Sequence, residues 1–241
     1  MSRYREHPPA PDLAALVACT WERQRSAGEE GEVRILPDGC ADLVWSSRGG
    51  LVVAGPDTGP VVYPLEPGYE AAGLRLRTGA AAEVLGLPLA ELRDLRAPLE
   101  DVWGGDAALL GERIASAPRG ERMQLLEQAV RPRTREVRAD SLVLASLPLL
   151  GGRGTNVAEL CRTLAISERA LRRRFDRAIG YGPKKLDRIL RFRRFLRRAA
   201  SPGAESLAAT AAELGYADQA HLNRECRRLS GLTPAELLGR A

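Results

Sequence analysis

This chain of 241 residues has only two histidines and four cysteines. Structural zinc sites use Cys and His ligands that come in closely spaced pairs. The four cysteines, Cys19, Cys40, Cys161 and Cys226, lie far from one another in the sequence and provide no such pair. We therefore expect no metal and no cofactor, and in a reducing compartment these residues should be free thiols.

Long apolar runs are also absent. No segment approaches the roughly 20 apolar residues that a membrane-spanning helix requires. The N-terminal residues MSRYREHPPAPDL have basic side chains but no apolar stretch behind them, so they do not resemble a secretory signal. We therefore expect a cytoplasmic protein that makes no membrane contact. No catalytic triad, phosphate-binding loop or paired carboxylates stand out either, so we do not expect an enzyme.

Lysine is scarce as well, and the charge is unevenly distributed. Of 36 basic residues only Lys184 and Lys185 are lysine. Residues 1–130 carry 13 basic and 20 acidic side chains (net −7), whereas residues 131–241 carry 23 and 11 (net +12), and the two values sum to the overall +5. An acidic half joined to a basic half suggests two domains with different partners.

The most informative feature is a repeat near the C-terminus. The segment 171–186 reads LRRRFDRAIGYGPKKL, and the segment 222–237 reads LNRECRRLSGLTPAEL. At a constant offset of 51, six pairs are identical: Leu171 and Leu222, Arg173 and Arg224, Arg177 and Arg228, Gly180 and Gly231, Pro183 and Pro234, and Leu186 and Leu237. Six identities in one register indicate two copies of one structural unit.

The first half has the pattern of a mixed domain. Short apolar segments bounded by Gly and Pro predict strands at 32–36, 41–46, 51–54, 61–65 and 73–77. Helical spacing of apolar residues follows at 80–85, 89–95, 107–115 and 122–130. We therefore predict an N-terminal regulatory domain over 1–130, β-rich in 1–78 and helical in 79–130.

The charged, proline-containing segment 131–136 is predicted to be a linker. It leads into a C-terminal domain over 137–241, with helices expected at 137–149, 156–164, 168–179, 184–199, 206–214, 219–229 and 234–239. The predicted fold class is α+β. A β-rich domain with trailing helices is followed by an all-α domain in which two helix-turn-helix units, about 156–179 and 206–229, are joined by a central helix.

Each unit has the features of a DNA reader. Ser167 and Asp218 can cap the second helix of each unit, and the pairs Leu171 and Phe175, and Leu222 and Cys226, are spaced to be buried. Polar side chains on the outer faces of these helices can bond base edges in the major groove, and they are Arg169, Arg172 and Arg173 in the first unit and Gln219, Asn223 and Arg224 in the second. Further basic side chains are expected to contact phosphates: Arg174, Lys184, Lys185 and Arg227, with Arg177, Arg188 and Arg228 nearby. The alternative, a basic bundle with a merely solvated surface, does not account for the repeat.

Residues from about 137 to 241 resemble the AraC/XylS-type DNA-binding domain. The motifs are SERALRRRF at 167–175, GYGP at 180–183 and ELGYADQAHLNRECRRLSGLTP at 213–234. The resemblance implies two helix-turn-helix units in one chain that read successive major-groove turns, with the base-contacting positions falling on the six outward residues named above. Cys226 stands where the family usually has Phe, and Leu186 replaces a common Tyr, which implies a slightly smaller core.

The N-terminal half resembles a module found on a subset of these regulators, through LPDGCADLVW at 36–45, AGPDT at 54–58 and AAGLRLRTGAAAEVLGLPLAEL at 71–92. The resemblance implies a sensor role without naming an effector. Cys40 and Trp45 are the candidate ligand-contacting residues, although a buried thiol and core tryptophans (Trp21, Trp45 and Trp103) are the better interpretation. Asp38 and Asp42 flank Cys40 and should raise the pKa of its thiol, which argues against a redox sensor.

Three functions are open at this point. The first is a transcription regulator that binds double-stranded promoter DNA, with a small-molecule effector and a contact to RNA polymerase as further partners. The second is a DNA-binding module controlled by a protein partner. The third is a DNA-repair enzyme with an AraC-like tail, which the scattered cysteines disfavour because that chemistry needs a zinc-bound cysteine. The protein is expected to act as a monomer or as a homodimer formed through the N-terminal domain.

Overall fold

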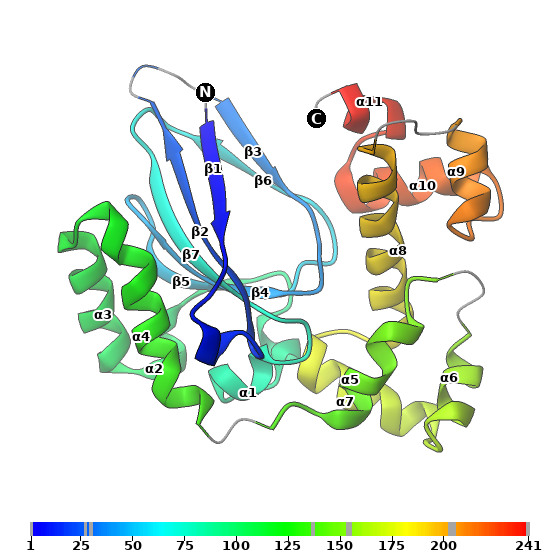
Figure 1. Ribbon diagram of the computed structural model, residues 1–241, viewed down its shortest axis with the longest axis horizontal. Helices are drawn as coiled ribbons and strands as arrows, with labels where there is room; N and C mark the ends of the chain where they lie inside the picture. Colours follow the sequence, from blue (N-terminus) through cyan, green and yellow to red (C-terminus); the bar gives the residue numbers. More distant parts are fainter. Residues whose placement is uncertain are drawn as a thin grey trace.

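The computed structural model of the chain describes residues 2–26, 28, 31–135, 138–152, 156–201 and 206–239. A β-rich part with helices on one side lies next to an all-helical part (Figure 1). The predicted α+β class and its two-part organisation are confirmed.

An antiparallel sheet forms the centre of the N-terminal half. Its strand order is β1-β2-β7-β4-β5-β8. The bounds are β1 Ser2–His7, β2 Val17–Arg25, β4 Ala41–Ser46, β5 Gly50–Ala54, β7 Glu70–Leu76 and β8 Arg96–Pro98. A separate pair, β3 Gly31–Ile35 with β6 Val61–Leu65, continues the β4–β5 hairpin beyond the turns 36–40 and 55–60.

The predicted strands are all present, but the sequence missed β1, β2 and β8. β1 lies at the sheet edge with one exposed aromatic, Tyr4, and so has no buried stripe to detect. β2 is buried on both faces along its first half and therefore does not alternate. β8 is a three-residue edge strand that contains Pro98, a residue that edges tolerate.

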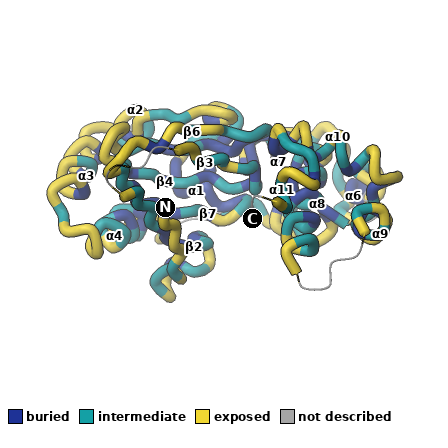
Figure 2. The backbone as a smooth tube through the Cα atoms, turned by 90° about the horizontal axis from the view of Figure 1, so that it is seen from above, coloured by how far each residue is buried: buried dark blue, intermediate teal, exposed yellow. Residues whose placement is uncertain are grey.

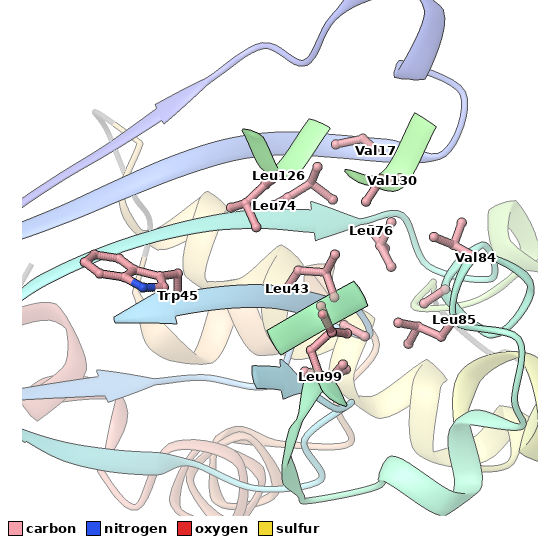
Figure 3. Close-up of a cluster of buried hydrophobic side chains, with 14 of the residues drawn as sticks. Val17, Leu43, Trp45, Leu74, Leu76, Val84, Leu85, Leu99, Leu126 and Val130 are labelled. Atoms are coloured by element: carbon pink, nitrogen blue, oxygen red, sulfur yellow. The ribbon is translucent and has the colours of Figure 1, made fainter. Parts of the chain in front are cut away.

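Helices cover one face of this sheet. They are α1 Ala81–Leu85, α2 Leu99–Trp103, α3 Gly105–Ser116 and α4 Arg122–Thr134. Leu43 and Leu74 of the sheet pack with Leu126 and Val130 of α4 in a buried cluster (Figure 3). The sequence missed α2. The predicted helix 89–95 is only a 3₁₀ turn, Leu89–Leu92, because Arg93 leaves the helical conformation with a ψ of 126° and Asp94 follows with a positive φ of 59°.

The predicted linker 131–136 is wrong in its first residues. Helix α4 continues through Pro132 to Thr134. Its last turn is held against the N-terminal half, because Arg131 Nε donates to Asp12 Oδ2 at 2.6 Å and the Arg133 guanidinium lies 4.0 Å from the Trp103 ring centroid. Residues 136 and 137, where the linker was expected to meet the second domain, lie outside the described residues.

The C-terminal half follows the predicted helices closely. They are α5 Ser141–Ser146, α6 Val157–Thr163, α7 Glu168–Ile179, α8 Pro183–Ala199, α9 Leu207–Glu213, α10 Gln219–Ser230 and α11 Pro234–Gly239. The helix expected over 137–149 is shorter, because Asp140 caps α5 by accepting from the backbone of Leu142 and Val143. A second core, separate from the first, includes Phe175, Phe192 and Phe195, all fully buried.

The two halves lie side by side and touch (Figure 2). α1 and the turn Leu89–Leu92 pack on α7. Among the described residues, no helix has both the length and the apolar content needed to cross a membrane.

Candidate DNA-binding surface

The first helix-turn-helix unit consists of α6 and α7. Asn156 Oδ1 accepts from the Ala158 N–H at 2.8 Å and caps α6, and Ser167 Oγ accepts from the Ala170 N–H at 3.3 Å and caps α7. Leu171 is fully buried, as the sequence predicts, and with Phe175 it anchors one face of α7 in the core. The opposite face of α7 is therefore fixed toward solvent.

The second unit consists of α9 and α10 and has the same construction. Ser206 Oγ caps α9 through the Ala209 N–H at 3.2 Å, and Asp218 Oδ1 caps α10 through the His221 N–H at 2.6 Å. Leu222 and Cys226 are fully buried at the positions that correspond to Leu171 and Phe175. The predicted caps and buried positions of both units are confirmed.

Both recognition helices, α7 and α10, also end in the same way. Gly180 and Gly231 have φ values of 92° and 75°, the left-handed conformation that glycine adopts without strain. Pro183 and Pro234 then begin the next helices, α8 and α11. The repeat identified in the sequence is therefore a repeat of backbone geometry.

Helix α8 joins the two units (Figure 1). The Arg188 guanidinium donates to both carboxylate oxygens of Glu225 on α10, at 2.6 and 2.7 Å. Asp187 accepts from the Gly151 N–H at 2.7 Å and from Arg191 at 2.7 Å. These contacts attach the central helix to α10 on one side and to the segment after α5 on the other.

The structure places the predicted base-reading residues on the outer faces of the recognition helices. Arg169, Arg172 and Arg173 are exposed on α7. On α10, Gln219 and Arg224 are exposed and Asn223 is half-buried. Arg172 Nε lies 3.6 Å from Asp176 Oδ2, an exposed pair that contributes little to stability and leaves the guanidinium available. Each helix thus presents three polar side chains of the type that bonds base edges.

The predicted phosphate contacts fall into two groups. Lys184 and Arg227 are exposed. Arg174 is exposed but donates to Asp140 at 2.7 Å. Lys185 instead lies at the contact between the halves, where its Nζ donates to the Thr58 carbonyl at 3.3 Å, and burial together with the nearby Arg228 lowers the pKa of its ammonium. A DNA phosphate would therefore have to compete with Asp140 for Arg174 and with Thr58 for Lys185.

Three further basic residues were expected nearby. The charge of Arg188 is already balanced by Glu225, and Arg177 lies 3.6 Å from Glu83 of the N-terminal half. Arg228 remains exposed. Arg197, on α8, is also exposed, although the sequence did not single it out because it belongs to neither repeat.

The N-terminal candidates do not converge on a pocket. Trp45 is a core residue, 5% exposed, and the Arg122 guanidinium lies 4.3 Å from its ring centroid. The Cys40 thiol lies 3.6 Å from Thr78 Oγ1 and, because of burial and the nearby Asp38 and Asp42, its pKa is raised. Trp21 belongs to a different hydrophobic cluster from Trp45, as part of a small group with Cys19. The interpretation as core aromatics therefore fits the structure better than a shared pocket.

Two hollows on the surface are lined by other residues. One is formed by five residues of α3 and α4 and the segment between them: Glu112, Arg113, Ser116, Ala117 and Leu125. The other lies along the β3–β6 pair, from Gly31 to Pro67. Neither includes Cys40 or Trp45, and both are open to solvent. Within the described ranges, no group of three or more His, Cys, Asp or Glu side chains could hold a metal ion.

Comparison with known protein families agrees with this geometry. Residues 160–240 match a family described as "Helix-turn-helix domain", and residues 5–98 match one described as "Domain of unknown function (DUF6597)". The first match covers nearly all of both units, so the C-terminal region is similar to a helix-turn-helix domain. The expected combination of such a domain with a distinct N-terminal module is confirmed.

Solved structures of ToxT from Vibrio cholerae show a distant likeness. ToxT from strain O395 is 9% identical with a TM-score of 0.44, over 99% of this chain and 96% of that one. The unsaturated fatty acid bound wild-type ToxT from strain SCE256 is 12% identical with a TM-score of 0.43, over 99% of this chain and 94% of that one. At these values the likeness says nothing further about this chain. No curated protein matches it.

Proposed function

We propose that this chain is a sequence-specific transcription regulator of the AraC/XylS type that reads two successive major grooves with α7 and α10. One observation carries the proposal. The same capped, glycine-terminated helix is built twice, and each copy presents polar side chains to solvent on the face opposite its buried residues. A stable fold alone would not require a group of base-bonding side chains on the outer face of both copies.

The roles within each helix follow from side-chain chemistry. Arg169, Arg172 and Arg173 have guanidinium groups that can bond O6 and N7 of guanine in a bidentate way. In the second unit, Gln219 and Asn223 have amides suited to N6 and N7 of adenine, and Arg224 again suits guanine. The first unit should therefore prefer G-rich steps, and the second a mixed sequence.

The phosphate contacts should come from basic side chains beside the recognition helices. Lys184 and Arg227 are exposed and free to make them, whereas Arg174 must first leave Asp140. Contacts of this kind add affinity that is independent of sequence and falls as salt rises.

The N-terminal half is proposed to modulate DNA binding. The two surface hollows described above are open to solvent, and their lining does not specify an effector. A small molecule and a protein partner both remain candidates for the input, and RNA polymerase is the expected contact of an activator. The chain can act as a monomer, since two recognition helices in one chain suffice for one site. It can also act as a homodimer formed through this half.

The test is selection of bound sequences from a random DNA pool with the full chain. Enrichment of one motif with two contacts about one helical turn apart would support the proposal. Changing Arg173 or Arg224 to Ala should then cost about 1–3 kcal/mol and relax preference at one position. Changing Lys184 to Ala serves as the comparison, because it should weaken all sequences alike and flatten the salt dependence. Enrichment of no motif would refute the proposal.

A further inference from the structure

Two turns of the N-terminal half lie against the DNA-binding half rather than around a pocket. They are Leu36–Cys40 and 55–60, which contain the motif residues Pro37-Asp38-Gly39 and Gly55-Pro56-Asp57. A β-carbon added at Gly39 would lie 2.9 Å from Leu186 Cδ1 at the start of α8. One added at Gly180, at the end of α7, would lie 2.6 Å from Pro56 Cγ and 3.0 Å from the Leu89 carbonyl oxygen. Both glycines also have positive φ values, 85° and 92°, so the two halves approach closely where glycine is the favoured residue.

These turns are held in shape by their own hydrogen bonds. Asp38 Oδ1 accepts from the Cys40 N–H at 2.9 Å. Asp57 is buried and accepts two hydrogen bonds from Arg96, at 2.7 and 2.8 Å. Asp94 accepts from the Thr58 N–H at 2.6 Å. Charge-assisted bonds of this kind make the surface that faces α7 and α8 a rigid one.

The N-terminal half makes a second, separate contact with α10. Arg34 Nη1, on β3, donates to the Ser230 carbonyl at 3.0 Å. That carbonyl is in the last turn of α10, where the helix dipole favours a positive charge. A β-carbon added at the next residue, Gly231, would lie 3.2 Å from Arg34 Nη1 and 3.8 Å from Pro60 Cγ.

The two contacts fall on equivalent positions of the repeat. Gly180 and Gly231 are the glycines that end the two recognition helices, and they are 51 residues apart, as are the other repeated positions. One N-terminal half therefore touches the same end of both helices. The N-terminal residues of a recognition helix are the ones that contact bases, so this grip leaves the reading ends uncovered.

We infer that the N-terminal half acts as a clamp, formed by Arg34, Pro56 and Leu89, which fixes the relative placement of the two recognition helices. The inference rests on the proposed DNA-binding function and adds a mechanism to it. A movement of the clamp displaces the C-terminal end of α7 relative to that of α10. Because each helix is rigid, its N-terminal end, which contacts bases, moves as well. An input that moves the turn 55–60 or β3 would thus change which spacing of half-sites the protein accepts.

The experiment measures affinity as a function of half-site spacing. The full chain binds its selected site, and sites with one base pair inserted or removed between the two contacts. An insertion moves one half-site by about 3.4 Å and rotates it by about 34°. The wild-type chain should lose roughly tenfold or more in affinity at the altered spacings, the cost of a poorly matched site.

Two variants release the clamp at different points. Arg34→Ala removes the bond to Ser230, and Pro56→Ala removes the Cγ atom that lies against Gly180 at the end of α7. Each should reduce the penalty for altered spacing to less than about threefold, with the base preference within each half-site unchanged. Arg48→Ala is the matched control, because Arg48 pairs only with the exposed Glu66 among the described ion pairs and lies on the same half. Pro56→Ala decides the question if Arg34→Ala does not fold.

The outcomes separate the two proposals. A wild-type chain that enriches no motif would refute the DNA-binding function itself. A wild-type chain with a sharp spacing preference that both clamp variants retain in full would refute the clamp and leave the DNA-binding function standing. Equal broadening by Arg48→Ala would also overturn the clamp, because the effect would then follow from loss of any arginine in this half.

Discussion

The turn inside each helix-turn-helix unit offers a paired test of backbone strain. Ala165 has a φ of 51°, and Gly215, at the same place in the second unit, has a φ of 78°. The hydrogen bonds agree as well. The Ile166 N–H donates to the Cys161 carbonyl at 3.0 Å, and the Tyr216 N–H donates to the Ala211 carbonyl at 2.9 Å. One turn is therefore built once with alanine and once with glycine.

The expected magnitude follows from two opposing contributions. A left-handed conformation costs an L-residue about 1–2 kcal/mol. Replacing alanine by glycine relieves that strain, but the greater conformational freedom of glycine in the unfolded chain costs about 0.4–1 kcal/mol. The Ala165 side chain is exposed, so little packing is lost. Ala165→Gly should raise the free energy of unfolding of the C-terminal half by about 0.5–1 kcal/mol, and Gly215→Ala should lower it by a similar amount.

The assay must report on the C-terminal half alone. Tryptophan fluorescence will not, because Trp21, Trp45 and Trp103 all lie in the N-terminal half. Native-state hydrogen exchange at the Leu171 and Leu222 amides follows α7 and α10 separately. Slower exchange in Ala165→Gly and faster exchange in Gly215→Ala would support the strain argument. Destabilisation by Ala165→Gly together with no effect of Gly215→Ala would refute it.

Three further predictions follow from the charged contacts. Asp140→Asn keeps an oxygen to cap α5 but frees Arg174, so affinity for all DNA sequences should rise by roughly two- to tenfold, as a filter-binding titration would show; unchanged affinity would contradict this. A double-mutant cycle on Arg188 and Glu225 should give a coupling of about 1–2 kcal/mol in the free energy of unfolding, since the bidentate pair is largely buried, and a coupling near zero would argue against it. Burial raises the pKa of Asp42 to about 6, so the contribution of this residue to stability is greatest below its unfolded pKa near 4 and is lost as the pH rises through 6. The free energies of unfolding of the wild type and Asp42→Asn, measured in urea, should therefore diverge between about pH 4 and 6. A constant difference over that range would contradict the pKa shift.

The sequence predicted the C-terminal half well because its signals are local. Helix α7 begins and ends where Ser167 and Gly180 indicate, since a cap and a left-handed glycine are properties of a few adjacent residues. The buried positions Leu171 and Leu222 follow equally from spacing along one helix. Repetition of the same pattern 51 residues later then confirms it within one chain.

The N-terminal half was less predictable because its signals depend on distant neighbours. β2 does not alternate because both of its faces are covered. Pro132 was read as a linker, yet the helix continues through it because Trp103 and Asp12 hold its last turn from far away in the sequence. The contacts of Arg34 and Pro56 with α10 and α7 likewise join residues well over 100 positions apart, which no local pattern reveals.

Two reading heads in one chain gain affinity only if both can bind at once. Linking two modules raises the effective concentration of the second at its site, and the gain disappears when the geometry is wrong. Helix α8 has 17 residues and so spans about 25 Å, less than the roughly 34 Å between successive major-groove turns. The remaining distance must come from how each unit is set at the ends of α8. Near the start of α8, Arg188 binds Glu225 of α10 and Asp187 binds the Gly151 N–H. Near its end, Arg198 binds Glu213 of α9, and the clamp adds a further constraint from outside the domain. Control of the spacing between the two recognition helices is therefore divided between the two halves. Through the proposed clamp, the N-terminal half can regulate DNA binding without covering the side chains that contact the bases.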